Sequence, residues 1–286
     1  MRLPACLEGA ADLHVHSSPD VDPRRYDDFE LAQEAARAGM SALLIKSHQG
    51  STVERALLAS KIAGGFKVFG GLVLNQPVGG LNPDAVDIAL RLGAKEIWMP
   101  TRSAANHRRR HGQTGGITLL DPDGRLAPAA DEIVRRMAGE DCILATGHVS
   151  PEEGLALIDR ALALGVRKVM VTHPEWYGTV YPADVQRALA SRGVFFERCF
   201  VSTTHRCGFT PFEVIENAIA AAGVATTVLA TDLGQPDTPA PVEGLKLYAE
   251  RLLASGFSPD DLRRMMCENP RRLLSLDAAG APLRED

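Results

Sequence analysis

The stretch that decides the fold is ADLHVHS, residues 11–17, which places two histidines one residue apart on an apolar segment. In an extended chain, residues two positions apart point to the same side. His14 and His16 therefore share one face of an expected strand, and Leu13 and Val15 share the other. The apolar pair is expected to pack outward against helices, which leaves two imidazoles facing an interior. Such an arrangement is either a costly core or a metal site.

Seven further apolar segments follow, and amphipathic segments separate them. This alternation is typical of βα units and of a parallel sheet. Eight such units in about 250 residues, joined by short turns, predict a single (β/α)8 TIM barrel of the α/β class. We expect it to form one domain over residues 1–286. The expected strands cover residues 11–17, 42–48, 67–75, 96–101, 142–148, 168–173, 194–200 and 226–232.

Three of the expected helices carry a recognisable start. A hydroxyl residue followed three positions later by Glu is typical of a capping box, in which the two residues satisfy free N–H groups at the helix start. The pairs are Ser51 with Glu54, Ser150 with Glu153, and Thr210 with Glu213.

The longest irregular connection, residues 101–130, follows the fourth expected strand. Within it, ITLLDPDGRLAP at 117–128 predicts a small hairpin around an Asp-Pro-Asp-Gly turn. A loop that follows a strand belongs on the C-terminal face of the barrel, where the active sites of this fold lie. The insertion is therefore expected to be a lid over the site or, alternatively, a solvated loop.

The bulk composition favours a globular protein with a small-molecule partner. Apolar residues make up 45% and charged residues 23% of the chain, and its formal net charge of -5 gives no general attraction for nucleic acid or anionic membranes. No apolar stretch approaches the roughly 20 residues of a membrane span, and no targeting segment is evident, so a cytoplasmic location is expected. The five cysteines form no CxxC pair, which argues against a disulfide framework and a zinc knuckle. Homo-oligomer formation is left open.

The histidines show where chemistry is expected. All eight lie at the end of an expected strand or in the loop beyond it, and the strand ends of a barrel converge on one mouth. Imidazoles and a carboxylate suit Zn²⁺, which in catalytic sites takes about three protein ligands and keeps a position for water. Other first-row metals also fit. The set comprises His14, His16, His148, His173 and Asp232, the last as both a ligand and the base that takes a proton from water.

Other polar residues are candidates for the same mouth. Lys46 and His48 share a face of the second expected strand, and we expect a direct role in the site, with His48 catalytic; the alternative is an ordinary polar pair. Glu197 and Cys199 share a face of the seventh expected strand, so one register brings both into the barrel and the other brings neither. In the first register Glu197 is a candidate for substrate contact.

Four residues outside the strands are candidates for substrate contact. They are His107, His111, His205 and Arg108, the last within a run of three arginines that could hold an anionic substrate. A run of charges is more often a solvated face, and that alternative stays open.

The motifs together resemble the amidohydrolase superfamily of metal-dependent hydrolases. The resemblance covers about residues 10–276. In detail, the chain is similar to a poorly characterised amidohydrolase-like group. By that resemblance His14, His16, His148 and His173 are metal ligands, and Asp232 is a ligand and the proton shuttle. The motifs that carry it are DLHVHSSPD, IKSH, GGLNP, WMPT, ATGH, VTHP, LATDLGQP and ENPRRLL.

One departure from the resemblance concerns the number of metal ions. Binuclear members commonly carry a bridging carboxylated Lys or a Glu on strand four, and we expect the segment EIWMPT to supply neither as a bridge. Lys46 could substitute from strand two. The expected cofactor is therefore one or two divalent metal ions per chain, with zinc favoured.

The leading functional hypothesis is a metal-dependent hydrolase acting on an amide, lactone or ester bond of a small molecule. A decarboxylase or hydratase remains an alternative, because relatives with a similar ligand set perform those reactions. A phosphoesterase of the polymerase and histidinol phosphatase type ranks lower, since that group usually ends its metal set with Asp-x-His, whereas Leu233 and Gly234 follow Asp232 here. The non-enzyme alternative is a barrel that binds a metal or a metabolite without turning it over.

Overall fold

The computed structural model describes residues 3–277 and contains eight strands, each paired in parallel with the next along the chain. All eight lie inside the segments expected from the sequence, but each is shorter than expected. The strands are β1 (Ala11–Val15), β2 (Ala42–Ile45), β3 (Lys67–Val73), β4 (Glu96–Trp98), β5 (Ile143–Ala145), β6 (Val169–Thr172), β7 (Phe195–Cys199) and β8 (Thr227–Ala230).

The first and last strands meet and close the sheet. Val15 forms a parallel bridge with Leu233, just beyond β8. The His16 amide donates to the Leu233 carbonyl at 2.8 Å, and the Asp232 amide donates to the His14 carbonyl at 2.7 Å. The predicted (β/α)8 barrel is therefore confirmed, and its closing contacts join the very segments that carry the candidate ligands.

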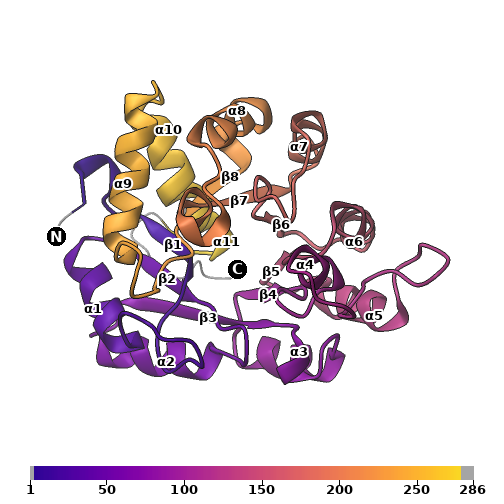
Figure 1. Ribbon diagram of the computed structural model, residues 1–286. Coiled ribbons are helices and arrows are strands. Elements are labelled where there is room, and N and C mark those ends of the chain that lie inside the picture. The colour runs from indigo at the N-terminus through magenta and orange to yellow at the C-terminus, as the bar shows by residue number, and fades with distance from the viewer. Residues whose placement is uncertain (1–2, 278–286) are drawn as a thin grey trace.

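Helices surround the strands (Figure 1). No helix within residues 3–277 is long and apolar enough to cross a membrane. A π-helical segment, Arg264–Glu268, joins the last two helices. The helices are α1 (Asp28–Arg37), α2 (Val53–Ile62), α3 (Pro83–Arg91), α4 (Ala105–Arg110), α5 (Pro128–Met137), α6 (Pro151–Ala163), α7 (Ala183–Ala190), α8 (Phe212–Ala222), α9 (Pro241–Ala254), α10 (Pro259–Arg263) and α11 (Asn269–Leu273).

One of the three expected capping boxes is present. Ser150 and Glu153 satisfy each other's backbone N–H groups at the start of α6, as predicted. The other two expected starts are wrong. Ser51 donates its hydroxyl to the Glu54 carboxylate at 2.6 Å, and α2 begins only after Thr52. The helix α8 begins after Pro211, and the side chain of Thr210 does not cap it.

The core forms an inner and an outer apolar layer. One cluster takes side chains from all eight strands and so fills the barrel interior, and two others join strands to the surrounding helices. Val15 packs outward as expected. Leu13 does not, because it lies in the inner cluster with Ala11 and Trp98. The cause is a register shift between Asp12 and Val15 in the β1–β2 pairing, which breaks the simple alternation of faces.

The long insertion between β4 and α5 has two parts. Its first part contains α4. Its second part is the predicted hairpin, where Leu120 bridges Leu126 in antiparallel fashion. The Leu119 amide donates to Glu153 at 2.7 Å and holds the hairpin against α6. Figure 1 shows the turn projecting beyond α5, away from the barrel centre.

Candidate metal centre

Asp232 is the point at which the strand-end histidines meet. Its Oδ1 lies 2.9 Å from His16 Nε2 and 3.2 Å from His14 Nε2, and its Oδ2 lies 3.3 Å from His173 Nε2. These residues come from the ends of β1, β6 and β8. The Asp232 side chain is 15% exposed, whereas those of the three histidines are almost fully buried, so the carboxylate is the part of the cluster that solvent can reach.

The backbone at the site is strained in two places. His173 and Asp232 have φ values of 51° and 52°, in the left-handed region that residues with a Cβ seldom adopt. Each is fixed by a hydrogen bond to a neighbouring strand, from the His173 amide to the Glu197 carbonyl (3.1 Å) and from the Asp232 amide to the His14 carbonyl (2.7 Å). Such strain concentrates at functional sites, where it aims a side chain.

Glu197 orients His14 from inside the barrel. Its Oε2 lies 3.0 Å from His14 Nδ1, and both side chains are fully buried. A carboxylate on Nδ1 fixes the imidazole so that Nε2 is free to act as a ligand. Cys199 Sγ lies 3.6 Å from the same nitrogen, so the register of β7 brings both Glu197 and Cys199 into the barrel. Glu197 was a candidate for substrate contact, but it lies beneath His14 and does not line the cavity described below.

Lys46 reaches the same cluster from β2. Its Nζ lies 3.0 Å from His14 Nε2 and 5.1 Å from the centre of the Trp98 ring. Burial lowers the pKa of the Lys46 amine, although Asp232 and Glu197 oppose that shift. Lys46 is therefore part of the buried polar cluster and, like Glu197, does not line the cavity.

Glu96 is a polar residue of this region that sequence reasoning missed. It begins β4, it is fully buried, and neither of its carboxylate oxygens has a hydrogen-bond partner within residues 3–277. Burial and the neighbouring Glu197 raise the pKa of Glu96 well above its usual range. The expectation that EIWMPT supplies no bridging Lys or Glu took no account of Glu96, because Glu96 lies at the start of its strand and the predicted ligands lie at strand ends.

A second group of rings faces the Asp232 cluster. His48 Nδ1 lies 2.9 Å from Thr101 Oγ1, and His148 Nδ1 lies 2.9 Å from His107 Nδ1. His107 stacks on His148 with ring centroids 4.9 Å apart, and Trp176 lies 5.0 Å from His148. The loops that follow β2, β5 and β6 and the helix α4 of the insertion thus supply one wall of imidazole and indole rings.

The protonation states follow from burial and from Asp232. Burial alone would lower the pKa of His14, but Asp232 and Glu197 raise it to about 9. Burial lowers the pKa of His16 to about 4 despite the contact with Asp232. Burial would raise the pKa of Asp232, but His14 and the other imidazoles hold it well below its usual range. Asp232 is therefore an anion at neutral pH, and His16 is a neutral potential ligand.

The donor set fits a divalent metal. His14, His16 and Asp232 each offer a ligand atom within 4.8 Å of the others, and so do His14, His173 and Cys199. Several ring nitrogens are buried without a hydrogen-bond partner in the described part of the chain, namely His16 Nδ1, His148 Nε2 and His173 Nδ1. Imidazole, carboxylate and thiol groups are the ligands that zinc prefers.

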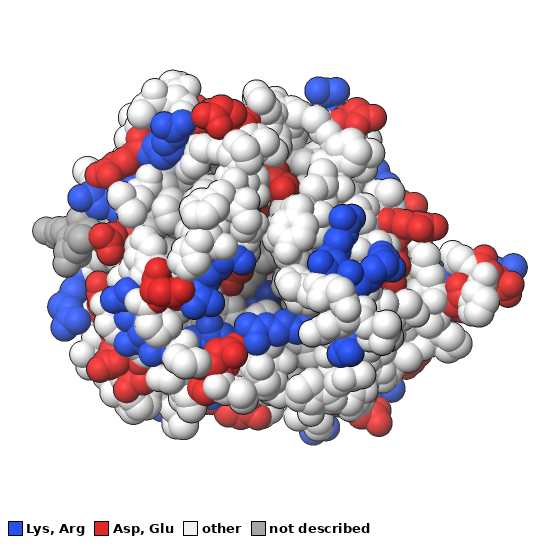
Figure 2. Space-filling model, in the orientation of Figure 1, with Lys and Arg blue, Asp and Glu red and all other residues white. Residues whose placement is uncertain are grey.

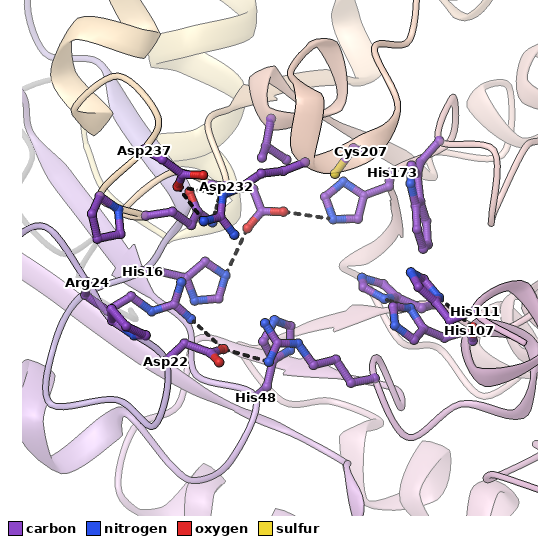
Figure 3. A pocket seen from close by; sticks show the side chains of 18 residues that line it. His16, Asp22, Arg24, His48, His107, His111, His173, Cys207, Asp232 and Asp237 are labelled. Atoms are coloured by element: carbon purple, nitrogen blue, oxygen red, sulfur yellow. Dashed lines mark hydrogen bonds and ion pairs between the residues drawn. The ribbon is translucent and has the colours of Figure 1, made fainter. Parts of the chain in front are cut away.

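A cavity of about 500 Å³ opens above Asp232 (Figure 3). His107 lines it, as expected for a substrate contact, and so does the neighbouring His111. Arg108 does not line it, because its Nε donates to the Thr114 carbonyl at 2.9 Å. His205 does not line it either and pairs with Asp237 at 2.9 Å. The residues that line it are His16, Asp22, Pro23, Arg24, His48, Arg102, His107, His111, His148, His173, Trp176, Val201, Arg206, Cys207, Asp232, Gln235, Pro236 and Asp237.

The lid expectation holds for only part of the insertion. Arg102, His107 and His111 line the cavity, whereas no residue from 112 to 128 does. Sequence reasoning also missed Asp22, Arg24, Arg102, Arg206 and Trp176 as lining residues. Their common signal is a position in a loop that follows a strand, which by itself does not separate them from other loop residues.

Solved structures of similar fold support the barrel assignment. An amidohydrolase from Pseudomonas aeruginosa aligns with a TM-score of 0.64 at 14% identity, covering 94% of this chain and 96% of that one. The organophosphorus hydrolase from Deinococcus radiodurans aligns with a TM-score of 0.60 at 15% identity, covering 95% of this chain and 94% of that one. A putative 2-pyrone-4,6-dicarboxylic acid hydrolase from Pseudomonas putida aligns with a TM-score of 0.57 at 18% identity, covering 94% of this chain and 98% of that one. At these identities the likeness shows a shared fold.

Sequence comparison gives the family. No protein with a curated description matches the chain. The sequence model of a family of unknown function, DUF6282, matches residues 9–197, which is more than half of the chain and includes four of the candidate histidine ligands. The chain therefore belongs to this family of unknown function, DUF6282.

Proposed function

We propose that the protein is a metal-dependent hydrolase that cleaves an amide, lactone or ester bond of a small molecule. The observation that carries the proposal is the meeting of three strand-end imidazoles on one carboxylate, Asp232, at the floor of the cavity. A cavity of about 500 Å³ is of the size that takes a small molecule. The structural neighbours include enzymes described as hydrolases, which agrees with this class.

The residues that would hold the metal are His14, His16, His173 and Asp232, with His148 beside them. A divalent metal bound there, with zinc favoured, would polarise the substrate carbonyl and lower the pKa of a water molecule toward about 7. Glu197 holds His14 through Nδ1 so that its Nε2 faces Asp232. Whether the site holds one ion or two depends on Lys46, which lies beside His14.

Asp232 is the proposed base. Its carboxylate is anionic, it is the most exposed group of the cluster, and it faces the cavity where substrate and water would meet. It can take a proton from water and pass it to the leaving group of the substrate. We assign His48 to contact with the substrate at the same cavity, because Thr101 fixes its ring through Nδ1.

Two other reactions remain candidates. A decarboxylase or hydratase would use the same residues. A phosphoesterase of the polymerase and histidinol phosphatase type is less well supported, because it would need His at position 234. Gly234 has a φ of 136°, and a Cβ there would collide with the carbonyl of His16. The backbone at 234 therefore has no room for a histidine.

The test is a screen of amides, lactones, esters and phosphoesters with metal-loaded and metal-stripped protein. We expect hydrolysis of one of the first three classes, only with metal, and with incorporation of one oxygen atom from ¹⁸O-labelled water into the product. Release of CO2 without oxygen incorporation would identify a decarboxylase instead. Equal turnover by stripped and loaded protein would contradict metal dependence.

A further inference from the structure

Three loops bring arginines to the cavity. Arg24 follows β1, Arg102 follows β4 and Arg206 follows β7, and all three line the cavity. Figure 2 shows basic side chains gathered around the hollow on this face. Arg206 is already held by Asp237, to which its Nε donates at 2.8 Å. Arg24 and Arg102 are different, because they share one carboxylate, that of Asp22.

Asp22 holds the two guanidinium groups together. Its Oδ2 lies 2.6 Å from Arg102 Nη1 and 3.6 Å from Arg24 Nη2. Arg24 Nη2 also donates to Asp20 Oδ2 at 3.2 Å. Each guanidinium carries five N–H donors, so both arginines keep donors that these carboxylates do not use. A pair of arginines fixed in this way presents a preformed fork for an oxyanion.

Arg24 is buried without full compensation. Its side chain is only 2% exposed, and its Nε has no hydrogen-bond partner within residues 3–277. A buried charged group with an unsatisfied donor is costly unless a partner is supplied. Figure 3 shows Arg24 beside His16 and Asp22, directed toward the cavity. Because Arg24 lines the cavity, a ligand bound there would meet its guanidinium group.

The shape of the guanidinium groups suits a carboxylate as the partner. Arg24 contacts Asp20 and Asp22, and Arg102 contacts Asp22. Arg25 is held in place by the backbone carbonyls of the loop after β8 rather than by an acid, at 2.6 and 2.7 Å. The planar carboxylate matches the planar guanidinium fork.

We propose that Arg24 and Arg102 bind a carboxylate group of the substrate, so that the natural substrate is a carboxylate-bearing small molecule. Arg24 lies across the cavity from His107 and His111 (Figure 3). A molecule bound by its carboxylate at Arg24 would therefore extend over Asp232 toward the ring wall, which includes Trp176, 5.6 Å from His107. The role in substrate recognition rests on the proposed hydrolase function, whereas carboxylate binding itself does not.

The test is calorimetric titration of chelator-treated, metal-free protein with benzoate, benzamide and phenylphosphate. Metal-free protein is used so that the carboxylate cannot bind through a metal. We expect benzoate to bind more tightly than its neutral amide or phenylphosphate. Arg24→Gln and Arg102→Gln should each weaken benzoate binding by about 10-fold or more, the loss typical of a charged hydrogen bond.

The matched control is Arg110→Gln, an exposed arginine of the same insertion outside the cavity, which should bind benzoate as the wild type does. Arg102 is 45% exposed, so its replacement leaves the fold intact even if that of Arg24 does not. Equal binding of benzoate and benzamide, no saturable benzoate binding by wild type, or unchanged binding by the Arg102 variant would overturn the proposal. Tighter binding of phenylphosphate would also overturn it, in favour of a phosphate. None of these results depends on turnover, so they separate this proposal from the hydrolase assignment.

Discussion

The two ends of the barrel treat charge in opposite ways. At the end where the strands begin, Asp141 accepts hydrogen bonds from Lys168, from Lys95 at 2.5 Å and from Ser275 at 2.6 Å. Lys168 also donates to the Leu273 carbonyl at 2.6 Å, which fastens the C-terminal segment beneath the barrel. Each of these charges has a partner, and the inner apolar cluster continues directly above them. Glu96, at the start of β4, is the exception, because its buried oxygens have no partner in the described residues.

At the end where the strands finish, polar atoms are left over. In the described residues, His16, His148 and His173 each have a buried ring nitrogen without a hydrogen-bond partner. The buried Nε of Arg24 has none either. His173 and Asp232 are also strained at φ. Features that cost stability persist where they serve another purpose. The comparison therefore indicates that the end where the strands begin serves stability and the end where they finish serves chemistry, as is usual for this fold.

The largest effect should come from removing His14 and His16, in and directly after β1. The double variant His14→Ala, His16→Ala deletes two of the three donors that converge with Asp232, so we expect it to lose its bound metal. Elemental analysis measures the metal, and circular dichroism checks that the barrel persists. The control is His205→Ala, which removes an exposed imidazole outside the cavity. Equal metal content in the double variant and the wild type would contradict the assignment.

Asp232→Asn should stop turnover, because an amide cannot take a proton from water. Loss of a general base typically lowers the rate by about 10² to 10⁴, and loss of a metal ligand adds to that. The matched carboxylate at the opposite end is Asp141, and Asp141→Asn should leave the rate near that of wild type. Once a substrate is known, the kcat values of both variants decide the matter. An Asp232→Asn rate close to wild type would rule out the proton role.

Lys46 gives a finer test, because it lies between the site and the barrel interior. Its Nζ is 3.0 Å from His14 Nε2, so we expect Lys46→Ala to lower the number or affinity of bound metal ions in a metal titration. Recovery of the lost metal on adding short carboxylic acids would indicate that Lys46 is carboxylated and bridges two ions. Without recovery, Lys46 acts by orienting His14. If wild type and Lys46→Ala each bind one metal ion per chain with equal affinity, Lys46 is not part of the metal site.

The barrel was predictable because its signals are periodic and local. Eight apolar runs, each followed by an amphipathic segment, suffice to predict (β/α)8 order, and all eight observed strands lie within the expected segments. The structure also brings strand-end residues from β1, β6 and β8 together, because barrel geometry alone places those ends at one mouth. Their roles as metal ligands remain predictions.

The remaining features depend on contacts that the sequence pattern does not encode. Leu13 faces inward because the register of β1 shifts, and a register shift leaves no mark on the apolar pattern. Arg24 and Arg102 meet through Asp22 because two loops from different parts of the chain approach each other. The hairpin lies aside from the mouth because Glu153 of α6 binds its backbone. The meeting of Arg24 with Arg102 and the position of the hairpin both depend on loop conformation.

The smallest effect is expected at the end of the barrel where the strands begin. There, Asp141→Asn should reduce the free energy of unfolding by about 1 kcal/mol at pH 7. The side chain is 31% exposed, so solvent screens its ion pairs and the loss stays modest. Burial would raise the pKa of Asp141, but Lys168 and Lys95 lower it to about 2 in the folded protein, below the value near 3.9 of an unfolded chain.

A carboxylate whose pKa is lower in the folded state stabilises the fold fully above its unfolded pKa, and that stabilisation is lost as the pH falls through the folded pKa. The difference between wild type and Asp141→Asn should therefore be constant from pH 7 to about pH 5 and shrink below about pH 4. Urea unfolding of both proteins across this range measures it. Because Asp141 lies at the opposite end from Asp232, the variant should keep its full metal content throughout. A difference that persists unchanged at pH 3, or a loss of metal at pH 7, would show that the two ends of the barrel are not separate in the way the charges indicate.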